Sequence, residues 1–169
     1  MMDKTPRQAT YVTMGKYACY LFSLIYIAEK LTHRHFDAEQ VFAWAKSAGF
    51  AGDDVFLGTK AGTASAHYIL AHLTGKRWSM RNVYELDYVP LEGEQVIARH
   101  EWVVQESGME RISSHFVVDD GKRGVEYDPM GDSNTVKNGK LVSLRVFTPE
   151  ARNVFKPVAA KEEAYERVD

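Results

Sequence analysis

The single cysteine of the chain, Cys19, is the first residue that could take part in catalysis. It lies near the start of the most apolar segment. A thiol with an ordinary pKa of ~8.5 is mostly protonated at neutral pH, whereas the nucleophile is the thiolate. The positive end of a helix dipole and a neighbouring imidazolium both favour the thiolate, so a reactive cysteine belongs at a helix N-terminus. Cys19 is therefore a candidate nucleophile, and its alternative role is that of most single cysteines, a small buried hydrophobe.

A histidine far along the chain, His115, offers the imidazole that such a cysteine needs. It lies in the segment 112–118, whose alternation places Ser113, His115 and Val117 on one face of a predicted strand. A histidine in an apolar strand must be neutral and hydrogen-bonded, or be paired with a group that offsets its charge. His115 is thus either a satisfied core histidine or a general base for Cys19.

A carboxylate for that histidine comes from the next predicted strand, which reads Val-Glu-Tyr-Asp at 125–128. An Asp-Gly pair at 120–121 predicts a hairpin between the two segments, and this hairpin would put Asp128 or Glu126 beside His115. Either carboxylate can accept from one ring nitrogen and orient the imidazole, which completes the nucleophile, base and orienter of an activated cysteine. Asp128 also precedes a proline, and a simple turn residue is the alternative interpretation.

Local signals predict the helices that would carry Cys19 and cover the strands. The predicted helices begin and end near 16–31, 37–49 and 63–75, with Thr63 as a cap and a loop over 50–62. Apolar side chains at three- and four-residue steps in the first of them are typical of a strongly buried helix. Asp37 is a predicted N-cap with Gln40 completing a capping box, and Gly49 stands where a helix C-terminus favours a left-handed residue.

After Gly75 the apolar period changes to that of strands. Strands are predicted over 77–86, 95–105, 112–118, 125–128 and 141–147. Asn138 and Gly139 form a second turn pair, which predicts another hairpin connection. Helices first and antiparallel strands second predict an α+β domain, with N-terminal helices packed on a C-terminal antiparallel sheet.

The composition is that of an ordinary globular chain with one domain. Its 169 residues, 45% of them hydrophobic, suffice for one well-buried core, and we assign 1–155 to that domain and 156–169 to a charged tail. A net charge of −2 without a basic cluster argues against nucleic acid as a partner. No signal peptide is visible, and the longest apolar stretch, 18–28, is shorter than the ~20 residues of a membrane span. We therefore expect a cytoplasmic protein without a membrane partner, of an oligomeric state that composition leaves open.

The remaining polar groups predict no metal site and no cofactor. His33 and His35 are two residues apart, and His67 and His72 are five apart, so neither pair shares one face of a helix. The polar stretch 132–135, Asp-Ser-Asn-Thr, follows Pro129 closely and is a candidate lining for a substrate cleft.

Taken together, a cysteine opening an apolar helix, His-Phe-Val-Val at 115–118 and Tyr-Asp-Pro at 127–129 resemble papain-like cysteine peptidases. The similarity is to the compact branch that includes bacteriocin-leader peptidases and many uncharacterised bacterial and phage proteins. It extends from Cys19 to about Phe147, in the same order of helices and sheet. The resemblance implies a papain-like fold, Cys19 as nucleophile, His115 as general base and acid, and Asp128 as the residue that holds the imidazole. It also implies a peptide or amide substrate.

Two positions depart from the pattern of that branch. A glutamine that helps to bind the oxyanion usually stands six residues before the cysteine, where this chain has Thr13, and Tyr20 replaces a frequent glycine. The side chains that could donate instead are Gln8, Thr13 and Lys16, beside the Cys19 backbone N–H. Removing one oxyanion donor costs about 10²–10³ in rate. The sequence therefore supports two hypotheses, a thiol hydrolase that works through an acyl-enzyme on Cys19 and a catalytically inactive papain-like domain that binds a peptide or a partner protein.

Overall fold

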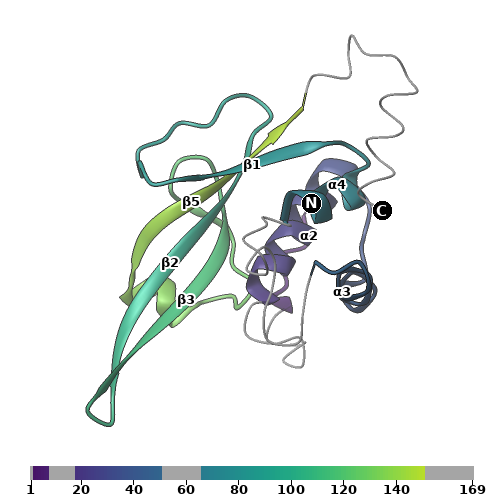
Figure 1. Ribbon diagram of the computed structural model, residues 1–169. Coiled ribbons are helices and arrows are strands. Elements are labelled where there is room, and N and C mark those ends of the chain that lie inside the picture. The colour runs from purple at the N-terminus through teal and green to yellow at the C-terminus, as the bar shows by residue number, and fades with distance from the viewer. Residues whose placement is uncertain (1, 8–17, 51–65, 151–169) are drawn as a thin grey trace.

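The computed structural model describes residues 2–7, 18–50 and 66–150. Helices come first along the chain and antiparallel strands second, which confirms the predicted α+β class (Figure 1). The helices that precede the sheet in these ranges are α2 (Ala18–Thr32), α3 (Ala38–Ser47) and α4 (Ala66–Thr74). The sheet consists of β1 (Trp78–Val83), β2 (Gln95–Glu106), β3 (Met109–Asp119), β4 (Val125–Tyr127) and β5 (Lys140–Pro149). A short helix, α5 (Asn134–Asn138), lies between β4 and β5 in sequence.

Helix α2 forms the centre of the core. It is apolar nearly all round, and every side chain from Ala18 to Glu29 is buried. A helix that is hydrophobic on all sides must be enclosed by protein, and α2 packs against both α4 and β3. Its described part agrees with the helix predicted over 16–31. Within the described ranges, no helix combines the length and the apolarity that crossing a bilayer requires.

The ends of α3 and α4 follow the predicted local signals. Asp37 is the N-cap of α3, and its carboxylate accepts a hydrogen bond from the Gln40 N–H at 2.9 Å. Gly49 follows α3 with φ 84° and Gly75 follows α4 with φ 71°, left-handed conformations that favour glycine. The predicted cap Thr63, most of the predicted loop before it and the predicted tail at 156–169 lie outside the described residues.

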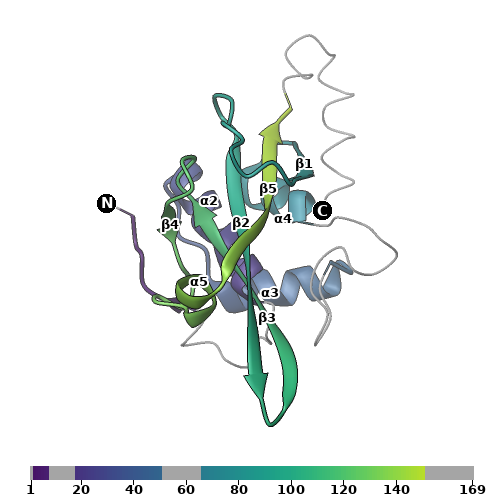
Figure 2. The ribbon, with the colours of Figure 1, turned by 90° about the vertical axis from the view of Figure 1, so that its left-hand side faces the viewer.

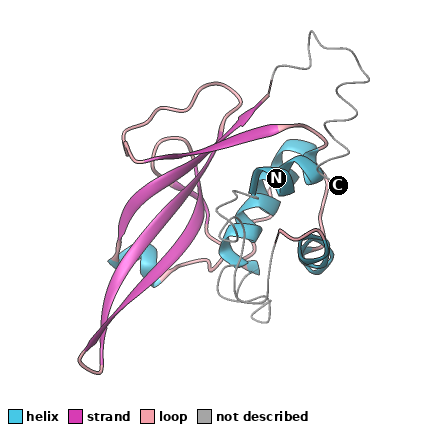
Figure 3. Cartoon of the chain, viewed as in Figure 1, coloured by secondary structure: helices cyan, strands magenta, loops and turns pink. Residues whose placement is uncertain are grey.

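The strands form a single sheet in the order β1-β5-β2-β3-β4, with antiparallel neighbours throughout (Figures 2 and 3). All five predicted strands are present, with bounds that differ by a few residues. The longest pairing joins β2 to β3 and closes at Ser107 and Gly108, both with positive φ, as a two-residue hairpin turn requires. This hairpin extends past the helices as a projecting arm (Figure 1).

Two hydrophobic clusters cover the two faces of the sheet. Phe116 and Val118 of β3 pack in the larger cluster with the helices, whereas Val117 packs in the smaller one on the opposite face. Val136 of α5 contacts that smaller cluster, so α5 lies across the sheet from α2, as Figure 1 shows. The predicted alternation of side chains is therefore confirmed for residues 116–118 of β3.

The two predicted turn pairs have different outcomes. Asp120 and Gly121 begin the connection between the antiparallel strands β3 and β4, which confirms the first hairpin, and Gly121 has φ 91°. The second prediction is wrong, because Asn138 ends α5 and Gly139 is its C-cap with φ −97°. Glycine is required there by a close approach, since a Cβ on Gly139 would collide with the carbonyl oxygen of Glu101. The same dipeptide thus ends a helix instead of turning a hairpin.

Candidate active site

The antiparallel pairing of β3 and β4 brings His115 and Asp128 into direct contact. β4 pairs with β3 at Tyr127 opposite Val118, so Asp128 follows at the end of the strand. His115 Nε2 lies 2.7 Å from Asp128 Oδ1, and the two side chains are only 5% and 7% exposed. The other predicted orienter, Glu126, instead pairs with Lys30 Nζ of α2 at 3.2 Å. Of the two carboxylates, the structure therefore assigns Asp128 to His115.

Backbone donors hold the Asp128 carboxylate in place. The Met130 N–H donates to Oδ1 at 2.9 Å, and the Ser133 N–H donates to Oδ2 at 3.2 Å. Burial by itself would raise the pKa of Asp128, but the hydrogen bond and charge of His115 and these two N–H groups outweigh it and hold the pKa below its ordinary value. The carboxylate is thus ionised and has a fixed orientation.

The N-terminal segment supports the strand that carries Asp128. The hydroxyl of Tyr127 donates to the Thr5 carbonyl at 2.9 Å, and its ring stacks on Tyr26 of α2 with centroids 4.6 Å apart. Arg7 forms an ion pair with the buried carboxylate of Glu29 on α2 at 3.0 Å. These contacts join residues 2–7, α2 and β4, so the residue directly before Asp128 is held from both sides.

The environment of His115 favours its charged form. Burial lowers the pKa of the imidazole, but the hydrogen bond to Asp128 and the interaction with the Cys19 side chain, together with the Asp128 charge, raise it to about 9. At neutral pH, His115 is therefore an imidazolium that is buried and paired, the one condition under which a charged histidine is tolerated in an apolar strand.

Cys19 is the third predicted residue, and its side chain interacts with His115. It is the second residue of the described part of α2. The next residue, Tyr20, stacks on Phe116 of β3 with ring centroids 4.5 Å apart, which holds the first turn of α2 beside the strand that carries His115. Cys19 is also 1% exposed and belongs to the hydrophobic core cluster. The structure thus brings Cys19, His115 and Asp128 together, with the sulfur buried.

The predicted oxyanion donors are the remaining part of the expected site. Gln8, Thr13 and Lys16 lie outside the described residues. Across the described ranges, no group of three or more His, Cys, Asp or Glu side chains is arranged to hold a metal ion.

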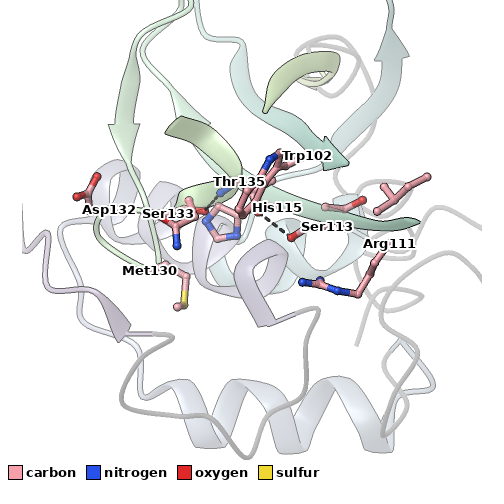
Figure 4. A pocket seen from close by; sticks show the side chains of 11 residues that line it. Trp102, Arg111, Ser113, His115, Met130, Asp132, Ser133 and Thr135 are labelled. Carbon is pink, nitrogen blue, oxygen red and sulfur yellow. Dashed lines mark hydrogen bonds between the residues drawn. The ribbon is translucent and has the colours of Figure 1, made fainter. Parts of the chain in front are cut away.

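A pocket of about 620 Å³ opens beside His115 (Figure 4). One wall is the segment of β3 from Arg111 to His115, and Trp102 of β2 lies next to it. The facing wall consists of Met130 and the stretch 132–135, so this polar stretch does line a pocket. Ser113 Oγ and Thr135 Oγ1 are 2.7 Å apart and hydrogen-bonded across the two walls. Cys19 is not among the residues that line the pocket.

One residue of the site, His100, escaped the sequence-based reasoning. It lies on β2 directly opposite His115, so the two imidazoles share one face of the sheet. Its Nδ1 is buried and has no hydrogen-bond partner among the described residues. Burial lowers the pKa of His100, and the neighbouring His115 lowers it further, which keeps His100 neutral. The strand predicted over 95–105 contained His100, but nothing in the sequence indicated which residue of β3 would lie opposite.

Comparisons with known proteins place the chain in a family without assigning it an activity. The family model described as protein of unknown function, DUF261, matches residues 3–149, and the chain belongs to this family. Neither the curated proteins nor the solved structures contain a match to the chain.

Proposed function

We propose that this DUF261 protein is a thiol hydrolase with a papain-like fold, which cleaves a peptide or amide bond through an acyl-enzyme on Cys19. The observation that carries the proposal is the buried His115–Asp128 pair, 2.7 Å apart, next to the only cysteine of the chain. A nucleophile, a base beside it and a carboxylate that orients the base are the parts that covalent catalysis by a cysteine requires.

The proposed reaction uses each of these residues in a defined role. Asp128 accepts from Nε2, which leaves Nδ1 as the ring nitrogen that exchanges a proton with the Cys19 sulfur. The thiolate attacks the carbonyl carbon, and the imidazolium then protonates the leaving amine, so that an S-acyl bond forms as the C–N bond breaks. His115, now neutral, takes a proton from water, which attacks the thioester and releases the acid. The C–S bond breaks as the Cys19 thiolate leaves, which restores the thiolate beside the imidazolium and closes the cycle.

The order of elements supports the papain-like part of the proposal. The cysteine belongs to the first turn of the described part of a central helix, and the histidine and the carboxylate lie on or just past two neighbouring antiparallel strands. This is the arrangement that the resemblance implies. The proposal also explains why an imidazolium is retained at a buried position. A buried charged pair adds little to stability by itself, whereas buried groups with shifted pKa values are common at reactive sites.

Alkylation of Cys19 tests the proposal directly. We expect iodoacetamide to add one carbamidomethyl group to the folded protein below pH 7, as measured by intact mass over time. His115→Ala should slow this labelling strongly at pH 6 and much less at pH 9, because only the low-pH rate depends on a neighbouring imidazolium. Glu126→Gln is the matched control, since Glu126 lies two residues from Asp128 but pairs with Lys30, and it should label like the unaltered protein.

Labelling of Cys19 only in denaturant would refute the nucleophile. It would show that Cys19 is a buried core residue, as its membership of the hydrophobic cluster allows.

The second candidate function is a papain-like domain that binds a peptide or a partner protein without turnover. The observation that favours it is the burial of Cys19, which is 1% exposed and absent from the pocket lining. Reactive Cys19 with no turnover on a broad panel of peptides and amides would support this alternative. Turnover that Cys19→Ser abolishes would exclude it.

A further inference from the structure

The face of the sheet that carries the larger hydrophobic cluster continues beyond that cluster as a polar surface. Phe116 of β3 belongs to the cluster, and its partner across the strands is Arg99 of β2. Arg99 in turn pairs with Ser143 of β5, and Arg145 lies two residues further along that strand. Cross-strand partners share one face of a sheet, and so do alternate residues of a strand. The two arginines therefore lie on the same face as Phe116.

One of these arginines has an acidic partner, whereas the other has none in the described part of the chain. Arg99 Nη2 lies 2.6 Å from Glu101 Oε2. Arg145 Nη1 donates to Ser143 Oγ at 2.9 Å, and its guanidinium carbon lies 5.5 Å from the centroid of the Phe116 ring. The titratable groups that act most strongly on Arg145 include no carboxylate. Its positive charge is thus held by a hydroxyl and an aromatic ring.

An unpaired arginine in this position is unfavourable for the protein by itself. The residue is half-buried, and a guanidinium keeps its charge at physiological pH. Burial lowers the pKa of Arg145, and the charge of Arg99 lowers it further, although the interaction with Tyr20 opposes both. A charge that is removed from water without a charged partner costs free energy. The surroundings of Arg145 therefore favour the binding of an anion.

This surface adjoins the candidate active site without belonging to the pocket beside β3. Arg145 interacts with the side chain of Tyr20 and lies over the ring of Phe116. These two rings stack, with centroids 4.5 Å apart. Each of them directly follows a residue of the proposed catalytic site, Cys19 on α2 and His115 on β3. An anion bound by Arg145 is therefore separated from that site by one layer of side chains.

We propose that Arg145, with Arg99 beside it, binds a carboxylate of an acidic peptide. A guanidinium presents two parallel N–H groups that match the two oxygens of a carboxylate. Since Glu101 balances Arg99, the two arginines and this glutamate leave one positive charge, which a single carboxylate neutralises. The side chain of Arg99 is 28% exposed, so solvent reaches this surface. The anion site goes beyond the proposed function, and only its assignment to a peptide rests on that function.

Titration of the isotope-labelled protein, followed by NMR, tests the site without any turnover. The probes are the N-acetylated tripeptide amides Ala-Glu-Ala and Ala-Gln-Ala, which differ by a single negative charge, and inorganic phosphate. The backbone amide signals of Tyr20 and Phe116 report binding, since both residues are retained in every variant. Cys19 takes no part in this measurement, so a failure of iodoacetamide to label it would refute the proposed function and leave the titration unaffected.

We expect the glutamate peptide to bind about tenfold more tightly than the glutamine peptide, because only the former makes charge-assisted hydrogen bonds. Arg145→Gln should reduce this ratio to about one. Arg111→Gln is the matched control, since it removes a positive charge from the pocket wall and should keep the ratio. Arg145→Lys keeps the charge but loses the planar fork, so it should lower the ratio in part. It provides the test if Arg145→Gln does not fold.

Several results would overturn the carboxylate site. They are equal binding of the two peptides, unshifted signals of Tyr20 and Phe116, and a ratio that survives in Arg145→Gln. A ratio that is lost in Arg111→Gln would place the anion in the pocket instead, and would also overturn it. Phosphate that shifts the same signals at lower concentration than the glutamate peptide would show that the site takes a free anion, and would refute the acidic peptide.

Discussion

Replacement of Asp128 by asparagine removes the charge that faces His115 and keeps the shape of the side chain. In the folded protein the pKa of His115 is raised from 6.5 to about 9. Because one pKa unit corresponds to ~1.4 kcal/mol, the charged form of His115 is stabilised by about 3 kcal/mol relative to an exposed histidine. The hydrogen bonds and charge interactions of His115 with Asp128 and Cys19 supply this stabilisation. Removing one partner of a buried pair typically costs ~3–5 kcal/mol. We therefore expect Asp128→Asn to lower the free energy of unfolding by about 2–3 kcal/mol at pH 6.5.

The pH dependence follows from the direction of the shift. A histidine with a raised pKa in the folded state contributes its full stabilisation below the unfolded value of 6.5 and loses it as the pH rises through about 9. The difference between the unaltered protein and Asp128→Asn should therefore be largest near pH 6.5 and shrink towards pH 9.5, where His115 has lost its proton in both.

Urea denaturation at pH 6.5, 7.5, 8.5 and 9.5 measures this difference. Glu126→Gln is again the control, because its pair with Lys30 is partly exposed and such pairs are worth about 1 kcal/mol or less. A difference for Asp128→Asn that is below about 0.5 kcal/mol, or one that grows as the pH rises, would refute the charged His115–Asp128 pair.

Two further predictions concern other parts of the chain. Glu94 has a side chain that is 1% exposed; burial opposes its ionisation, but hydrogen bonds from Thr148, Tyr88 and the Leu91 N–H lower its pKa from 4.5 to about 2. Its stabilisation is present above pH 4.5 and is lost as the pH falls to about 2, so Glu94→Gln should flatten the acid side of the stability curve, as measured by urea denaturation between pH 5 and pH 2.5. Gln8→Ala should lower the rate of the proposed hydrolysis by about 10²–10³ with little change in melting temperature, because an oxyanion donor acts mainly on the transition state. Full activity of that variant would leave Thr13 and Lys16 as the candidate donors.

Much of the fold could be predicted because its signals are local. The N-cap at Asp37 depends on residues within one turn, and the helix spacing of α2 and the alternation along β3 follow from side-chain direction alone. Gly139 marks the limit of such signals. An Asn-Gly pair suits a hairpin turn and a helix end equally well, and the contact that decided between them is with the backbone of Glu101, far away in sequence.

The chemistry of the candidate site was likewise predicted by residue type, but its geometry was not. Glu126 and Asp128 are two residues apart, so the hairpin alone offered both carboxylates to His115, and only the family resemblance pointed to Asp128. The fold gives the physical reason for Asp128, because the N–H groups of Met130 and Ser133 hold it towards the histidine while Lys30 of α2 pairs with Glu126.

The sequence alone determined the helices and strands, the turn at 120–121 and the three residue types of the site, because each depends on neighbours along the chain. The tertiary structure alone decided that Cys19 is buried beside His115, that His100 lies opposite it and that the edge of β3 borders a pocket. Burial, desolvation and strand pairing arise from contacts between residues far apart in sequence, and such contacts exist only after the chain has packed.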